Sequence, residues 1–202
     1  MQADAAEVAV TAAENDAVIY RVKPRESRFI VQAFAEGLLS AFGHNPKLAA
    51  REFAGQVTLN REQQRDQLDT SSLEFSVKAD SLVVTDDVSE KDRRELERVM
   101  KDEVLETSRF PDITFRSKSV TADLIYEGFY RVKITGELTL HGVAREHLID
   151  AQLRLMENGV RAEGESTLRQ SNFGIKRVSI AGGTLKVKDE VKMTFLIVAE
   201  KP

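Results

Sequence analysis

A two-residue alternation of apolar and polar side chains constrains the fold of this chain more than any other feature of its sequence. Leu73, Phe75 and Val77 alternate with polar residues in the segment 72–79, and residues 130–140 repeat the pattern. Successive side chains of a β-strand point to opposite faces, so each segment predicts a strand with one dry and one wet side. The chain is therefore expected to fold mainly as β-sheet.

The same alternation predicts enough strands for a closed barrel. Further strands are expected at 28–35, 53–59, 113–120, 149–155, 160–168 and 191–199, with a short possible addition at 19–22. Turn residues separate several of them, at Glu157-Asn158-Gly159, His141-Gly142 and Gly182-Gly183. Short connections favour antiparallel neighbours. The predicted fold class is all-β, an antiparallel barrel of about eight strands.

One segment, residues 89–107, departs from the strand pattern. Apolar residues recur there at helical spacing among charged ones: Leu96, Val99, Met100 and Val104. Ser89 is a suitable N-cap, and Pro111 prevents the helix from continuing. We expect one amphipathic helix that lies against an end or a side of the barrel.

Composition excludes several functional classes. The 202 residues include no cysteine, which excludes disulfides, thiolate metal sites and a cysteine nucleophile. A net charge of -4 with both signs mixed along the chain argues against nucleic-acid binding. No apolar run approaches the ~20 residues of a membrane span. Residues 1–17 are alanine-rich and acidic, so we expect a flexible tail before a single domain at 18–202. The expected location is the cytoplasm, or the periplasm if a leader has been removed.

No motif predicts a catalytic, metal or cofactor site. Of the three histidines, His44 and His141 lie beside glycine at expected strand ends, and His147 is expected to be an ordinary strand side chain. None has a second ligand at metal-binding spacing. No glycine-rich phosphate loop or Gly-x-Ser-x-Gly sequence is present. We therefore expect neither an enzyme, a metal nor a cofactor.

The expected interior is apolar, but one inward row is small. Ala162, Gly164 and Ser166 share the inward face of 160–168, which leaves space beside them. Inward apolar residues form the core of any β protein, so the small row is the observation that favours a cavity. The residues expected to bind a ligand are Phe29, Val31, Phe42, Phe53, Val57, Phe75, Val77, Phe115, Ile134, Leu138, Ala162, Gly164 and Phe195.

Several segments, in order, resemble the YceI-like family of lipid-binding barrels. They are YRV at 20–22 followed by Ser27 and Phe29, FAGQV at 53–57, FPDITFRS at 110–117, GELTLHGV at 136–143, NFGI at 172–175 and DEV at 189–191. The resemblance covers nearly all of residues 18–200. It implies a lipocalin-like barrel whose apolar tunnel takes a polyisoprenoid or another long amphiphile, usually in a homodimer. Lys23, where many members have aspartate, and residues 37–46 depart from the family pattern.

Three functional hypotheses follow. The first is a carrier or store for a long-chain isoprenoid or fatty amphiphile, with rim candidates His44, Asn45, Lys176 and Arg177 in expected loops. The second is a small-molecule enzyme that uses the cavity with His44 or His141 as base, which requires a histidine at the inner wall with a perturbed pKa and a carboxylate partner. The third is a dimeric interaction module with a filled core. Since each methylene removed from water contributes ~0.8 kcal/mol, a long apolar chain needs few polar contacts, which favours the first.

Overall fold

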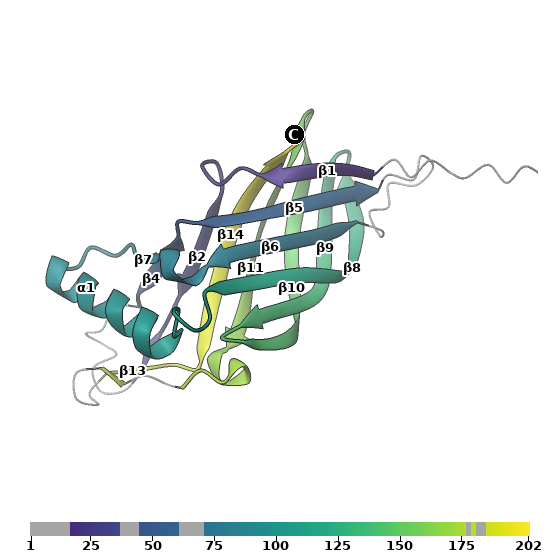
Figure 1. Ribbon diagram of the computed structural model, residues 1–202. Helices are drawn as coiled ribbons and strands as arrows, with labels where there is room; N and C mark the ends of the chain where they lie inside the picture. The colour runs from purple at the N-terminus through teal and green to yellow at the C-terminus, as the bar shows by residue number, and fades with distance from the viewer. Residues whose placement is uncertain (1–16, 37–44, 61–70, 177–178, 181–184) are drawn as a thin grey trace, which may run out of the picture.

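Eight antiparallel strands close into a barrel in the computed structural model, which describes residues 17–36, 45–60, 71–176, 179–180 and 185–202 (Figure 1). In order around the wall they are β1 (Ala17–Val22), β5 (Phe53–Asn60), β6 (Ser72–Lys78), β8 (Asp112–Tyr126), β9 (Phe129–Leu140), β10 (Val143–Leu155), β11 (Gly159–Arg169) and β14 (Glu190–Glu200). Arg21 and Val22 of β1 pair with Glu200 and Ala199 of β14, which closes the wall. The predicted lipocalin-like barrel is confirmed.

The strand that closes the barrel is β1, where the alternation predicted only a short additional strand at 19–22. β1 pairs along most of its length with β5, and only its last two residues reach β14. The chain then turns at residues 24–26 and returns as β2 (Arg28–Gln32), which pairs with β14 from Leu196 to Lys192. β1 and β2 therefore share one edge of β14 in succession.

The strand expected at 28–35 is interrupted, and several short strands were not expected. β2 ends at Gln32, and Ala35–Glu36 forms β3 in a separate small sheet with β13 (Leu185–Val187) and β12 (Ser179–Ile180). β4 (Lys47–Ala50) and β7 (Leu82–Val84) extend the wall beyond β2. The single helical turn η1 (Ala79–Ser81) directly precedes β7. Strands of three or four residues are too short to show a reliable alternation.

The predicted helix lies beside this extension, at the left end of Figure 1. α1 (Glu90–Val99) continues into a π-helical turn, η2 (Met100–Val104), and the Ser89 hydroxyl accepts a hydrogen bond from the Asp92 amide, as expected of an N-cap. Glu97 accepts from the Val84 amide at 3.0 Å. The helix thereby satisfies a backbone donor at the edge strand β7. In the described part of the chain, no helix is long and apolar enough to cross a membrane.

Candidate functional site

An apolar cavity of about 280 Å³ runs through the barrel and ends against the helix. Its walls carry inward side chains of every barrel strand except β1, together with side chains of β2, β4 and β7. Polar side chains at the wall include Ser72, Thr114, His147, Ser166 and Gln170. The hypothesis of a filled core is therefore wrong.

Most of the residues expected to bind a ligand lie on this cavity. They are Phe29, Val31, Val57, Phe75, Val77, Phe115, Ile134, Leu138, Ala162 and Phe195. Phe53 packs against the Phe75 ring, with 5.7 Å between the ring centroids, and belongs to the buried core instead. Phe42 lies outside the described residues.

Gly164 does not provide open space, contrary to the interpretation of the small inward row. A Cβ atom at Gly164 would lie 2.8 Å from the ring of Phe195, its partner on β14. The ring therefore occupies the place that the missing side chain leaves. Ala162 and Ser166, the neighbours of Gly164 on the inward face, do line the cavity.

Gly55 and Gly136 allow the same close approach of a phenylalanine ring. A Cβ at Gly55 would lie 2.8 Å from the Phe75 ring, and one at Gly136 would lie 2.5 Å from that of Phe115. Each ring can lie against the barrel wall because the glycine on the neighbouring strand has no side chain. The large rings consequently line the cavity without blocking it.

Replacing Gly136 with alanine is expected to destabilise the barrel by about 1–3 kcal/mol. The new Cβ would meet two groups at 2.5 Å, the Phe115 ring and the Arg116 carbonyl oxygen, and the second belongs to the backbone and cannot rotate away. Urea unfolding of the variant measures the loss. The double variant Gly136→Ala, Phe115→Leu should recover only part of it, and a full recovery would show that the carbonyl contact costs nothing.

The helix contributes wall residues that were not expected in the site. Leu96, Val99, Met100 and Val104 line the cavity, as does Leu105 just after the π-helical turn. Their helical spacing showed the apolar face, but periodicity does not tell which surface that face covers. Three strand residues that were not named as ligand-binding also line the cavity: Ile149, Ala151 and Leu153. Their signal was their place on the inward face of the strand expected at 149–155.

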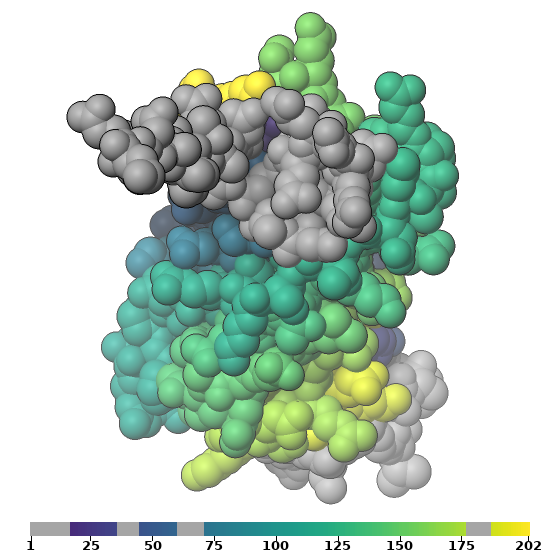
Figure 2. Space-filling model, turned by 90° about the vertical axis from the view of Figure 1, so that its right-hand side faces the viewer, coloured from purple at the N-terminus to yellow at the C-terminus, as the bar shows by residue number. Residues whose placement is uncertain are grey.

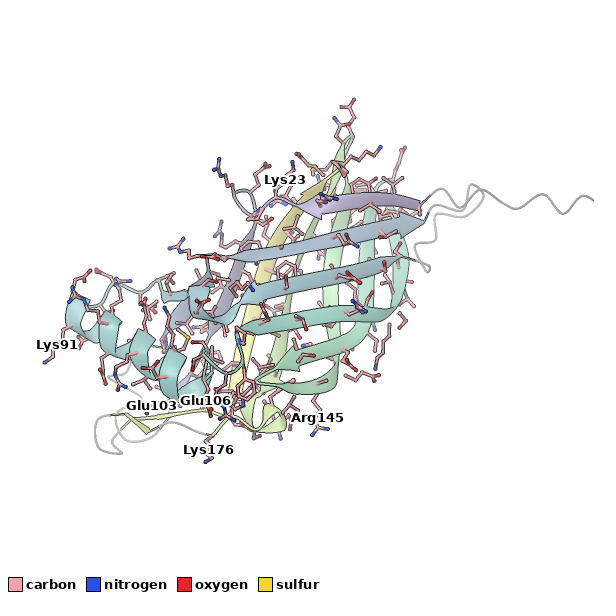
Figure 3. All side chains as sticks on the ribbon, viewed as in Figure 1. Lys23, Lys91, Glu103, Glu106, Arg145 and Lys176 are labelled. Carbon is pink, nitrogen blue, oxygen red and sulfur yellow. The ribbon has the colours of Figure 1, made fainter. Side chains whose placement is uncertain are left out.

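The rim candidates that can be placed lie away from the cavity wall. Asn45 accepts a hydrogen bond from the Ala35 amide at 3.1 Å, which secures a loop. Lys176 is exposed, and Figure 3 shows it at the lower end of the molecule. His44 and Arg177 lie outside the described residues.

His141 joins the end of the helical segment to the turn between β9 and β10. Its Nε2 lies 3.4 Å from Glu106 Oε1, and its ring packs against that of Phe110 at 4.4 Å between centroids. Hydrogen bonding from Arg109, and then the contact with His141, lowers the pKa of Glu106 below its usual value. Glu106 and His141 both have positive φ, 45° and 52°, a costly conformation for these residues. This contact fixes the helical segment to the barrel.

Of the two histidines that the structure describes, His147 is the one that reaches the cavity, although the alternation did not single it out. Its Nε2 lies 2.7 Å from the Ser166 hydroxyl on β11. Burial lowers the pKa of His147. The base that the enzyme hypothesis required was His44 or His141 with a carboxylate partner at the inner wall, whereas the partner of His147 is a hydroxyl. In the ranges that the structure describes, no group of three or more acidic or histidine side chains could hold a metal ion.

The lowered pKa of His147 predicts a loss of stability in mild acid. Unfolded chains bind a proton at this residue near the ordinary pKa of about 6.5, whereas the folded protein resists it. The free energy of unfolding should therefore fall as the pH drops below about 6.5. Urea midpoints between pH 8 and pH 5 measure the slope, and His147→Gln should flatten it. An unchanged slope in the variant would assign the effect to other groups.

Comparisons with known proteins agree with this architecture. The family model described as YceI-like domain matches residues 20–199. The crystal structure of Burkholderia cenocepacia BcnA is similar at 16% identity and a TM-score of 0.65, with 88% of this chain and 98% of that chain covered. A polyisoprenoid binding domain from Saccharophagus degradans is similar at 13% identity and a TM-score of 0.62, over 92% and 99% of the two chains.

A third similar structure is the YCEI protein of Campylobacter jejuni, at 15% identity and a TM-score of 0.55, with 79% of this chain and 87% of that chain covered. A comparison with curated proteins found no match. At these identities the solved structures support the fold alone, but the family model spans almost all of the barrel, from β1 to β14. The chain therefore belongs to the YceI-like family.

Proposed function

We propose that this protein binds a long-chain apolar molecule, a polyisoprenoid or a similar amphiphile, inside its barrel and carries or stores it. The observation that supports the proposal is the apolar cavity of about 280 Å³, close to the lower end of the range of ligand pockets, ~300–1,000 Å³. Burial of the ligand supplies ~0.8 kcal/mol for each methylene, so no strong polar contact is needed along the tail. The Saccharophagus degradans domain, described as polyisoprenoid binding, adds support.

Mass spectrometry of protein purified from its own host without detergent tests the proposal. We expect a native mass above that of the chain by one amphiphile, and the same molecule in an organic extract of the protein. Added isoprenoid alcohol should also bind with one-to-one stoichiometry. Ligand-free protein that excludes added isoprenoids would overturn the proposal. Transfer of the ligand between two populations of vesicles, at a rate set by the protein concentration, would distinguish carriage from storage.

We also propose that the protein forms a homodimer, as the family resemblance implies. Three consecutive large apolar residues at the end of β8 support this proposal: Leu124, Ile125 and Tyr126 are 45%, 47% and 54% exposed. Exposed apolar clusters of this kind are typical of protein–protein contacts. Light scattering should give the molar mass of two chains, and a monomer at all concentrations tested would exclude the dimer.

A further inference from the structure

The backbone pairing between β10 and β11 stops before either strand ends. Pairs run from Leu155 opposite Val160 to Asp150 opposite Glu165. Beyond that point β10 continues to Val143 paired with β9, and β11 continues to Arg169 paired with β14. Each strand thus keeps one neighbour while the two diverge. We call this part of the wall, residues 143–149 and 166–169, the β10–β11 seam.

A second pocket, of about 270 Å³, lies at the seam and has a polar lining. Charged or polar side chains around it are Arg145, Glu146, Thr167, Arg169, Asn172 and Glu190. Figure 3 shows Arg145 at the lower end of the barrel, beside the turn η3 (Gln170–Phe173). In Figure 2, the surface of β10 (green) and that of the segment around η3 (yellow-green) adjoin in the lower half of the view.

His147 and Leu168 lie on the walls of both pockets. The Ser166 hydroxyl lies 2.7 Å from His147 Nε2 and 3.2 Å from the Leu148 carbonyl oxygen. These side-chain contacts therefore cross the seam where the backbone pairing is absent. A ligand head group that displaced the contact between Ser166 and His147 would find hydrogen-bond donors and acceptors on both side chains. These side chains lie at the boundary between the apolar cavity and the polar pocket.

We propose that the β10–β11 seam holds the head group of the bound amphiphile, which breaks the contact between His147 and Ser166 and hydrogen-bonds to both side chains while its tail lies in the apolar cavity. This assignment rests on the proposed function. A hydroxyl or carbonyl left inside the apolar cavity would lose its hydrogen bonds to water, and the seam replaces them.

The charges at the seam favour an uncharged head group. Arg145 and Arg169 bring two positive charges, and Glu146 and Glu190 bring two negative ones. A phosphate would meet both carboxylates as well as both arginines, so attraction and repulsion offset each other and its lost hydration is not replaced. An alcohol or a carbonyl compound can use the arginines, the hydroxyl of Thr167 and the amide of Asn172 without such a penalty. The ligand class is thus a long-chain molecule with a neutral, hydrogen-bonding head.

Competition binding with matched probes tests the assignment. The probes are geranylgeraniol, its methyl ether, which lacks the hydroxyl proton, and geranylgeranyl phosphate. We expect geranylgeraniol to bind most tightly, and Ser166→Ala and His147→Leu to weaken it about tenfold while changing the methyl ether little. Gln152→Leu, an exposed position on the same strand, is the control and should change neither. Equal losses for alcohol and ether, no loss, or tightest binding of the phosphate would overturn the assignment.

Photo-crosslinking locates the head group directly. A geranylgeranyl probe with a diazirine at its head end should label peptides that contain residues 143–149 or 166–169. Labelling of α1 or of the hairpin tips near Gly128 and Asn158 would overturn the seam assignment but leave the proposed function intact. If neither the alcohol nor its ether bound to the wild-type protein, the proposed function itself would fail.

Discussion

Replacing Ala162 with phenylalanine should weaken the binding of a long-chain amphiphile by roughly a hundredfold while the barrel remains folded. Ala162 lies on the cavity wall between Leu153 of β10 and Ile197 of β14. The added ring has open space before it and would take the place of about four methylenes of the ligand. At ~0.8 kcal/mol each, that loss is about 3 kcal/mol. Titration with an isoprenoid alcohol gives the change in Kd.

The control is the same change on the outside of the barrel. Gln152 is exposed on β10, next to Leu153 in the chain and on the opposite face of the sheet. Gln152→Phe adds a ring of equal size, and the affinity should stay within a factor of about two. Urea unfolding should show that both variants are folded. Undiminished binding by folded Ala162→Phe would place the ligand outside the cavity.

Phe173→Ala is expected to produce the largest loss of stability, about 3–5 kcal/mol. The Phe173 side chain is 3% exposed and packs in a cluster of buried side chains with Leu168, Ile175 and Val191. It lies in the turn η3, which follows β11 and reaches the pocket between the diverging strands. The truncation would leave a cavity that barrel strands cannot close, because each is held by a neighbour.

Phe129→Ala is the matched control for this prediction. Phe129 lies at the start of β9, is partly exposed and stacks on Tyr126 with 4.8 Å between ring centroids. Its removal leaves little new cavity and should cost roughly 1 kcal/mol. Urea midpoints and m-values of the two variants provide the comparison. Similar losses would show that Phe173 contributes no more to the packing of the barrel than the partly exposed Phe129.

Local patterns predicted much of the fold because each pattern involves only residues that are close together in the sequence. The alternation at 72–79 corresponds to β6 together with Ala79, and that at 130–140 corresponds to β9. Ser89 caps the helix through the Asp92 amide, and the turn at 157–159 joins β10 to β11. Each of these features depends on residues a few positions apart, so the chain specifies them before any distant contact forms.

Long-range pairing decided what those patterns could not. Only the register between β11 and β14 sets the Phe195 ring over Gly164, so that the expected open space is filled there and remains beside Ala162. His147 has no distinguishing neighbour in the sequence, yet the antiparallel pairing of β10 with β11 brings it to Ser166. A pair of residues 19 positions apart has no periodic signal.

By itself the sequence determined the long strands, the helix and which face of each is apolar, because the period of side-chain direction is a local property of the backbone. Tertiary structure alone decided that β1 closes the wall, that the helix faces the cavity and that a polar seam opens beside it. Whether apolar side chains meet or leave a space depends on which strands become neighbours and in which register, and those are contacts between distant parts of the chain.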